Sequence, residues 1–149
     1  MRKFMEVKKE FKKTTSDKVL LPVRATKKSC AYDFYAQQDY VCLPDTVTKI
    51  WSDVKCCMED DDRLDINIRS SMGGIFELAN TIGYIDADYF ENKKNDGNIG
   101  LFLRNVSNQI QYIKKGDRIA QGTFSKYLIT DDDCPLSEER VGGFGSTNK

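Results

Sequence analysis

The last residues of the sequence are of types that suit a phosphate ligand. Arg140 precedes a run rich in glycine and hydroxyl residues, Gly142-Gly143-Phe144-Gly145-Ser146-Thr147. Backbone N–H groups, hydroxyls and a permanent guanidinium are donors that bind a polyphosphate, and an aromatic ring held among glycines can stack on a base. The run is not a Walker loop, because it lacks Gly-Lys-Ser/Thr. Taken alone, the residues fit a nucleotide-binding tail and a flexible C-terminal tag without a ligand equally well.

Two aspartates in the segment Gly83–Tyr89 could take part in acid–base chemistry. If this segment is extended, Tyr84, Asp86 and Asp88 share one face, and the side chains between them share the other. One aspartate could then act as a general base or lie near a metal ion. Taken alone, the segment is more typical of acidic residues at the exposed end of a strand.

Three further segments are weak signals when each is taken alone. Arg69-Ser70-Ser71 follows an alternating strand pattern and offers a cation and two hydroxyls to a phosphate. Gly116–Gln121 is typical of a turn that enters a strand, and we expect Asp117 and Arg118 to form a structural ion pair there. Ala31–Tyr35 is typical of an ordinary strand that contains one acid.

Missing residue types exclude several classes of site and of protein. The 149 residues contain no histidine, which excludes a Ser-His-Asp triad, a Cys-His pair and any zinc site with a histidine ligand. The five cysteines show no CxxC spacing, so we interpret them as reduced structural thiols of a cytoplasmic protein. No apolar run approaches the ~20 residues of a membrane span, and no signal peptide is recognisable, so we expect no membrane association.

Charge is distributed unevenly along the chain. Residues 1–28 contain ten Lys/Arg and three Asp/Glu, although the whole chain balances 23 basic against 23 acidic residues. This basic segment could meet a polyanion, or it could be a solvated edge strand whose lysines discourage pairing with other chains. We favour the edge strand and expect no stable binding of nucleic acid, because no groove-reading motif accompanies the charge.

The elements that must position these residues are short strands. Brief runs rich in β-branched and aromatic residues are separated by turn formers, and several alternate with period two, so the pattern predicts an all-β barrel or sandwich without long helices. The predicted strands are 19–23, 40–43, 47–51, 64–68, 99–103 and 109–113. We expect one domain over residues 1–139 and a mobile glycine-rich segment over 140–149.

Taken together, the five segments resemble the five motifs of the trimeric deoxyuridine triphosphatase (dUTPase) family in order and approximate spacing. The resemblance extends from about Leu21 to the end of the sequence. The matching segments are Cys30–Ala36, Arg69–Gly73, Asn80–Tyr89, Gly116–Gln121 and Arg140–Thr147.

This resemblance implies a jelly-roll-like, distorted β-barrel that forms a homotrimer with active sites shared between chains. The implied reaction converts dUTP and water into dUMP and pyrophosphate, with Mg²⁺ bound by the triphosphate. Phosphoryl chemistry of this kind depends mainly on positioning and charge neutralisation, so a carboxylate, a water and fixed donors suffice without histidine.

The resemblance also implies a role for each matching residue. Asp86 would be the base that deprotonates the attacking water, Tyr89 would pack under the deoxyribose, and Asp33 would touch Mg²⁺ only through water. The other expected substrate contacts are Asn80, Gly83, Tyr84 and Ile85 around the uracil, with Gly100 beside them; Arg69, Ser70, Ser71 and Gln121 on phosphates; and Arg140, Phe144, Gly145, Ser146 and Thr147 as a lid.

The sequence departs from the family pattern in three places. Ala31 stands where the family usually has glycine, and the stretch from Arg69 to Asn80 is about two residues shorter by family comparison. A longer loop, Phe90–Asp96, replaces a short turn and offers a place where a protein partner could dock. A catalytically dead or moonlighting nucleotide-binding regulator is therefore the alternative function, and a dCTP deaminase of the same fold is a weaker one.

Overall fold

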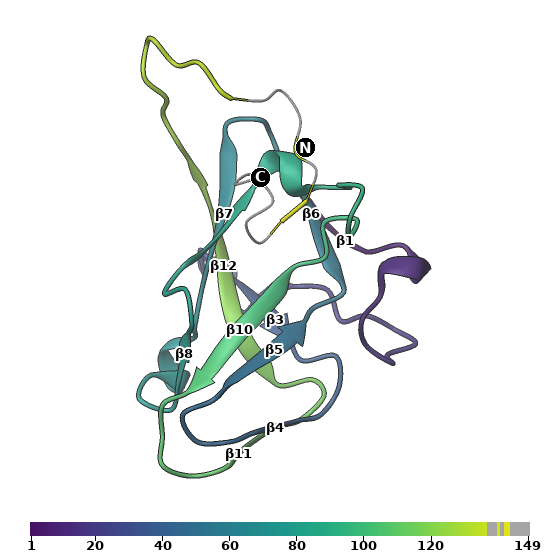
Figure 1. The fold of residues 1–149 in the computed structure, drawn as a ribbon, viewed down its shortest axis with the longest axis vertical. Coiled ribbons are helices and arrows are strands. Elements are labelled where there is room, and N and C mark those ends of the chain that lie inside the picture. The colour runs from purple at the N-terminus through teal and green to yellow at the C-terminus, as the bar shows by residue number, and fades with distance from the viewer. Residues whose placement is uncertain (137–139, 141, 144–149) are drawn as a thin grey trace.

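The computed structural model of the protein describes residues 1–136, 140, 142 and 143 (Figure 1). These residues form twelve strands and three single-turn 3₁₀ helices, and the described part of the chain contains no α-helix. The elements in chain order are β1 (Lys3–Glu6), η1 (Lys9–Phe11), β2 (Val23–Arg24), β3 (Tyr32–Tyr35), β4 (Tyr40–Cys42), β5 (Val47–Trp51), β6 (Val54–Cys57), β7 (Asp62–Asn67), η2 (Ser70–Met72), β8 (Phe76–Leu78), β9 (Gly83–Asp86), η3 (Ala87–Tyr89), β10 (Gly100–Asn105), β11 (Gln111–Ile113) and β12 (Arg118–Lys126).

The strands are arranged as four small antiparallel sheets around one core. The largest has the order β2-β3-β12-β7-β9, and the others are β5-β10-β8, β11-β4 and β1-β6. The fold is therefore all-β and barrel-like, as predicted, although its ladders do not join into one closed sheet. The strand β9 lies at an edge of the five-stranded sheet, next to β7.

Alternation along β7 separates the core from the polar surface. Leu64 and Ile66 are buried while Arg63 and Asp65 are only half-buried, which is the period-two pattern that predicted this strand. Gly122 of β12 lies over the same core, and a Cβ at this position would approach the Phe34 ring to 2.9 Å and Leu64 to 3.0 Å. Glycine therefore allows β12 to pack closely on its neighbours.

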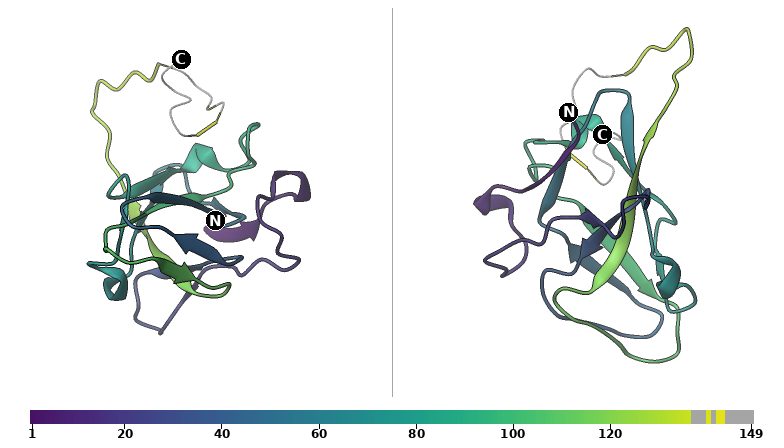
Figure 2. Two further views of the ribbon diagram at one scale, coloured as in Figure 1. Left: turned by 60° about the horizontal axis from the view of Figure 1, so that its bottom comes forward. Right: turned by 180° about the vertical axis from the view of Figure 1, so that it is seen from behind.

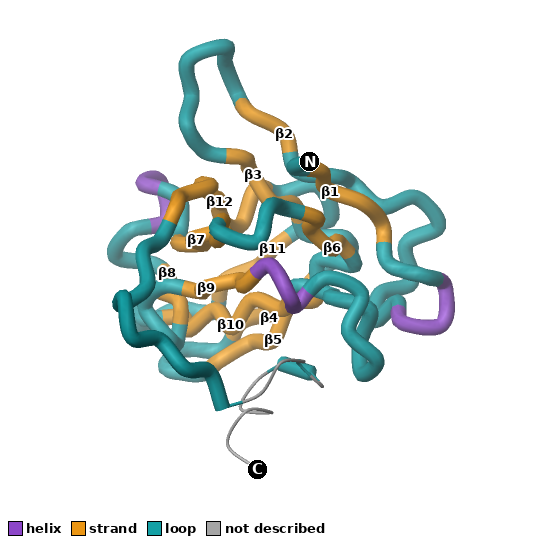
Figure 3. The backbone as a smooth tube through the Cα atoms, turned by 90° about the horizontal axis from the view of Figure 1, so that it is seen from above, coloured by secondary structure: helices purple, strands orange, loops and turns teal. Residues whose placement is uncertain are grey.

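The N-terminal segment is part of the fold. Residues 3–6 form the edge strand β1, which pairs with β6, and η1 follows at the periphery of the molecule (Figure 3). The backbone N–H groups of Lys13 and Thr14 donate to the buried carboxylate of Asp53 at 2.8 and 3.0 Å. The basic segment is thus held by main-chain contacts to an acidic residue of the body.

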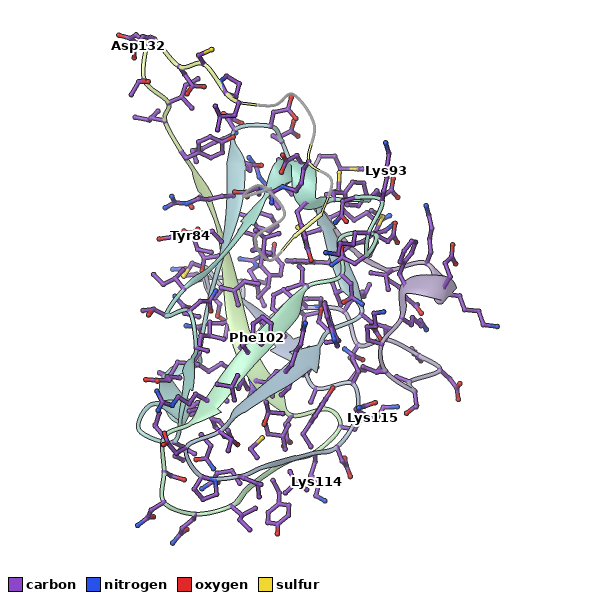
Figure 4. The ribbon with its side chains drawn as sticks, viewed as in Figure 1. Tyr84, Lys93, Phe102, Lys114, Lys115 and Asp132 are labelled. Atoms are coloured by element: carbon purple, nitrogen blue, oxygen red, sulfur yellow. The ribbon has the colours of Figure 1, made fainter. Side chains whose placement is uncertain are left out.

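After β12 the chain leaves the body as an extended arm. Residues 127–136 project away from the sheets, and Asp132 lies at the tip (Figures 2 and 4). Leu128 and Leu136 are fully exposed, and Ile129 is 69% exposed.

The structure agrees with the predicted strands at 40–43, 47–51, 64–68, 99–103 and 109–113 to within two residues at most ends. The prediction for 19–23 was wrong for most of its length, since strand pairing there is confined to β2 at 23–24. The strands β1, β6 and β8 complete the set. Within the described residues, no helix is long and apolar enough to cross a membrane.

Candidate active site

One cleft collects most of the residues of the predicted site. It has a volume of about 140 Å³ and lies between β9, η3 and the start of β10. Its lining residues are Asn80, Gly83, Tyr84, Ile85, Asp86, Tyr89, Gly100, Arg140 and Gly143.

The wall of this cleft is an edge strand. The strand β9 pairs with β7 on one side only, so its other side presents backbone N–H and C=O groups that no neighbouring strand of the described sheet satisfies. Tyr84 points outward from the sheet (Figure 4), where the Arg63 guanidinium lies 4.9 Å from its ring centroid. The side chain of Tyr84 is thus held away, and the backbone of β9 is left to read a ligand that has its own donors and acceptors.

Asp86 closes β9, and its carboxylate lies at the mouth of the cleft. The extended conformation predicted for Gly83–Tyr89 ends at Asp86, because Ala87–Tyr89 turn into η3. Arg140 donates to Asp86 and also to Asp88, with 2.6 Å between Nε and the Asp88 Oδ1. Both carboxylates remain more than half exposed, so they are accessible to solvent and to a ligand.

Tyr89 forms the floor of the cleft and is buried to 6% exposure. Its hydroxyl donates to the Asn98 carbonyl at 2.8 Å and accepts from the Asn95 amide at 2.6 Å. A Cβ at Gly143 would lie 2.5 Å from the ring of Tyr89, so the tail approaches this ring at a distance that only glycine permits. Burial raises the pKa of Tyr89, and the phenol is therefore neutral at physiological pH and able to donate.

A second cluster of predicted residues surrounds Asp33. Its carboxylate accepts from Arg69 Nε at 2.9 Å and from Arg118 Nη1 at 3.3 Å. Arg69 also donates to the Ser71 hydroxyl at 3.3 Å, and Gln121 is the cross-strand neighbour of Asp33 in the β3–β12 ladder. The cluster presents two guanidiniums, a hydroxyl and an amide, which are donors that phosphate oxygens accept.

The partner predicted for Arg118 was wrong. Arg118 pairs with Asp33 across the sheet, and the Asp117 carboxylate instead accepts from the backbone N–H of Lys114 at 2.8 Å. Asp117 lies in the turn before β12 and its carboxylate caps that turn, whereas Arg118 is the first residue of the strand. Ser70 and Ser71 are both exposed in the turn η2 beside this cluster.

The two clusters lie far apart within one chain. In the β7–β9 ladder Asp86 lies opposite Arg63, and Arg69 follows six residues further along the same chain. At ~3.3 Å per extended residue, the two backbones are separated by roughly 20 Å. Figure 1 shows the same arrangement, with η3 and η2 at opposite ends of the five-stranded sheet.

The described residues do not form a metal site of their own. Among the described residues, no three Cys, Asp or Glu side chains lie close enough to hold one. Asp33 is a single carboxylate paired with Arg69 and Arg118. These residues do not fit a metal site built only from protein ligands, but they fit a metal ion that arrives bound to a polyphosphate.

Four predicted lid residues, Phe144, Gly145, Ser146 and Thr147, lie outside the described residues. Sequence reasoning missed the contacts of Asn95 and Asn98 with Tyr89, and it missed Gly143 as a floor contact. The asparagines in the run Asn92–Asn98 were a signal, since side-chain amides at this density compete for backbone groups and build compact loops.

Comparison with known proteins gives a consistent result. A family model for dUTPase matches residues 17–148. Deoxyuridine 5'-triphosphate nucleotidohydrolase of Lactococcus lactis is 36% identical over 131 residues, which cover 85% of this chain and 87% of that protein. The enzyme of the same name from Yaba monkey tumor virus is 34% identical, with 91% and 93% coverage.

Solved structures show the same fold. The crystal structure of dUTPase from Streptococcus mutans superposes with a TM-score of 0.76 at 28% identity, and the match covers 86% of this chain and 98% of that one. The dUTPase of Staphylococcus aureus phage phi11 superposes with a TM-score of 0.68 at 18% identity, covering 94% and 97%.

Proposed function

This chain belongs to the dUTPase family, and from that premise we propose that it hydrolyses dUTP to dUMP and pyrophosphate. Such an enzyme keeps uracil out of DNA and supplies dUMP for dTMP synthesis. The observation that supports this most directly is the cleft itself, where an accessible carboxylate, an aromatic floor and an unpaired strand edge converge.

Asp86 is the proposed general base. Its carboxylate is at the mouth of the cleft and can orient and deprotonate a water for attack on the α-phosphorus. Arg140 forms an ion pair with this carboxylate. The proposed contact of Arg140 with phosphate therefore requires the guanidinium to leave Asp86 and to bind a phosphate oxygen instead. The lid, residues 140–149, would close in that exchange.

The uracil and the sugar would be read by rigid elements. Asn80 and the backbone of Tyr84 and Ile85 would contact the base edge, with Gly83 and Gly100 giving room beside it. Tyr89 would lie against the deoxyribose, where a 2′-hydroxyl has no space. Selectivity of this kind depends on fixed groups, since a buried polar group left unpaired costs about 1–3 kcal/mol.

The cluster around Asp33 is the proposed phosphate site. Arg69, Ser70, Ser71 and Gln121 would hold the phosphates there. Mg²⁺ bound to the triphosphate would meet Asp33 through water, and the ion would neutralise charge on the phosphates. The opposite charges of Asp33, Arg69 and Arg118 keep these side chains ordered for that task.

We propose a homotrimer with shared sites, and the separation of the two clusters supports sites that are shared between chains. A base must lie within ~3 Å of the water that it activates, and donors to the same substrate must be nearby, yet Asp86 and Arg69 of one chain are roughly 20 Å apart. One chain can therefore supply only one half of a site. The exposed aliphatic residues of the 127–136 arm give a surface through which chains could join.

The loop Phe90–Asp96 offers little to a separate protein partner. Asn92, Asn95 and Asp96 are buried, and the exposed residues of the loop are Glu91, Lys93 and Lys94 (Lys93 is labelled in Figure 4). A partner at this loop would have to recognise that small charged surface.

All five cysteines are free thiols, which supports our proposal that the protein works in the reducing cytoplasm.

The test compares four nucleotides. Purified protein with Mg²⁺ should release pyrophosphate from dUTP far faster than from dTTP, dCTP or UTP. Equal rates on dUTP and UTP would remove the role of Tyr89. Binding of dUTP without hydrolysis would favour the nucleotide-binding regulator, and release of ammonia from dCTP would favour the deaminase.

A further inference from the structure

The hydroxyl of Tyr89 is saturated by the loop that follows it. It donates to the Asn98 carbonyl and accepts from Asn95 Nδ2, and each bond is shorter than 2.9 Å. The ring is thus held at its hydroxyl end by two partners, and Tyr89 is also one of the residues that line the cleft. Asn95 belongs to the loop Phe90–Asp96, which sets this chain apart from the family pattern, and Asn98 follows this loop two residues later.

Asn95 is itself held in place by the loop. Its Oδ1 accepts from Asn92 Nδ2 at 2.7 Å and from the backbone N–H of Gly97 at 3.1 Å. The side chain is 8% exposed, so these bonds are shielded from water. Rotation of the Asn95 amide would break all of its side-chain bonds at once, which fixes the direction of the N–H that Tyr89 accepts.

The loop is anchored to the body by a buried charged residue. Asp96 is 1% exposed, and its carboxylate lies 3.0 Å from Lys55 Nζ and 2.8 Å from the backbone N–H of Lys8. Asn98 Nδ2 donates to Asp53 Oδ1 at 2.8 Å and to the Phe11 carbonyl at 3.1 Å. The N-terminal segment, β6 and the loop thus form one polar framework behind the ring.

We propose that Asn95 is a positioning residue that sets discrimination between deoxyribose and ribose by holding the Tyr89 ring through its hydroxyl. The inference rests on the proposed role of Tyr89 against the sugar. A ring can exclude one hydroxyl only if it cannot retreat, because a shift of a few tenths of an ångström relieves an overlap in a packed site. The hydrogen bond from Asn95 opposes such a shift of the Tyr89 ring, although Asn95 does not itself line the cleft.

The test compares two changes at Asn95 with a matched control. Asn95→Ala removes the amide, and Asn95→Asp keeps its shape and Oδ1 but replaces the Nδ2 donor to Tyr89 by a charged acceptor oxygen. Asn108→Ala makes the same deletion at an exposed turn residue. The measured quantity is the ratio of kcat/KM for dUTP to kcat/KM for UTP. We expect a fall of about three- to tenfold in both Asn95 variants, the equivalent of one hydrogen bond, and no change in Asn108→Ala.

A double-mutant cycle with Tyr89→Phe separates positioning from a general loss of structure. If Asn95 acts through the hydroxyl, the discrimination ratio of Asn95→Ala/Tyr89→Phe equals that of Tyr89→Phe alone. A second readout is the phenol titration of Tyr89, followed by NMR with ¹³C-labelled tyrosine. The hydrogen bond from Asn95 opposes the burial that raises the pKa of Tyr89, so Asn95→Ala should raise this pKa further.

Three results would overturn the inference: an unchanged ratio in both Asn95 variants, additive effects in the cycle, or an unmoved Tyr89 titration. If Asn95→Ala does not fold, Asn95→Asp and the cycle built on it decide the matter. If the wild type hydrolyses dUTP and rejects UTP, and the Asn95 variants show the same preference, only this inference is refuted. A wild-type protein inactive on dUTP would sink the proposed function instead.

Discussion

At the scale of residues, the described site contains two carboxylates with similar surroundings, of which only one is proposed to act as the general base. Asp86 and Asp88 both bind Arg140, and both are more than half exposed. They differ in position, because Asp86 ends the edge strand and lines both the small cleft and the neighbouring hollow, whereas Asp88 lies in η3 and lines that hollow, with Asp60 and Tyr127, but not the cleft. Only Asp86 faces the groups proposed to hold the nucleoside.

Replacing each aspartate by asparagine tests this difference. Asp86→Asn keeps size and polarity but removes the base, so kcat on dUTP should fall by about 10²–10⁴-fold, with the dUTP dissociation constant nearly unchanged. Asp88→Asn is the matched control, since it also loses one ion pair with Arg140, and its kcat should fall far less. Pyrophosphate release and calorimetric titration measure the two quantities. Equal losses in both variants would assign the effect to Arg140 and refute the base.

At the scale of elements, the loop between η3 and β10 has a backbone that few residue types can adopt. Glu91, Asp96 and Gly97 all have positive φ, at 53°, 58° and 82°. A Cβ on Gly97 would also lie 2.9 Å from the Tyr89 carbonyl oxygen. The loop is therefore compact because its turns are tight and its amides are paired, and its conformation is coupled to Tyr89 through the backbone as well as the hydroxyl.

Three glycines with the same backbone conformation allow this coupling to be measured. Gly97, Gly74 and Gly116 have φ of 82°, 81° and 89°, but a Cβ at Gly74 or Gly116 would meet no atom within 4 Å. Gly74→Ala and Gly116→Ala should each cost about 1 kcal/mol of unfolding free energy from the backbone alone. Gly97→Ala should cost about 2 kcal/mol more, because the carbonyl must shift.

Urea unfolding at one fixed protein concentration measures these differences, since stability of an assembly depends on concentration. Of the three variants, only Gly97→Ala should also lower the preference for dUTP over UTP. Equal destabilisation by all three would show that the loop yields easily and does not brace the ring.

The sequence predicted elements well where one face of a strand is buried. Leu64 and Ile66 alternate with polar neighbours, and this alternation predicted the strand β7. The strand β6 is buried on both faces near its start, with Lys55 turned inward to Asp96, so it shows no alternation. Burial also raises the pKa of the Cys56 thiol to about 12, which suits a packing role. Lys55 and Asp96 are 41 positions apart in the sequence, so no local sequence pattern predicts their ion pair.

The site could be predicted only as a set of segments. Which of the motif residues meet depends on the β7–β9 register, and a shift of one residue would turn every side chain to the opposite face of the sheet. The asparagine loop behind Tyr89 depends on contacts with Lys8 and Phe11 of the N-terminal segment. Contacts of that sequence separation are set by the packed core and not by local propensity.

At the scale of the whole molecule, the two halves of the site lie at opposite ends of one sheet (Figure 1). In a closed symmetric assembly each interface repeats, so a half site of one chain can meet the complementary half of the next around a ring. The Asp86 half and the Arg69 half of one chain then serve different nucleotides. Under our proposal, activity would then be a property of neighbouring chains and not of one chain alone.

Mixing two inactive variants tests that arrangement. Asp86→Asn and Arg69→Ala should each be nearly inactive alone, because each assembly has one defective half in every site. When equal amounts are unfolded together and refolded, chains assort at random, and about one quarter of the sites receive an intact Asp86 from one variant and an intact Arg69 from the other. Activity should therefore return to about one quarter of that of the wild type. Refolding each variant alone is the control, and a mixture that stays inactive would mean that both halves of a site come from the same chain.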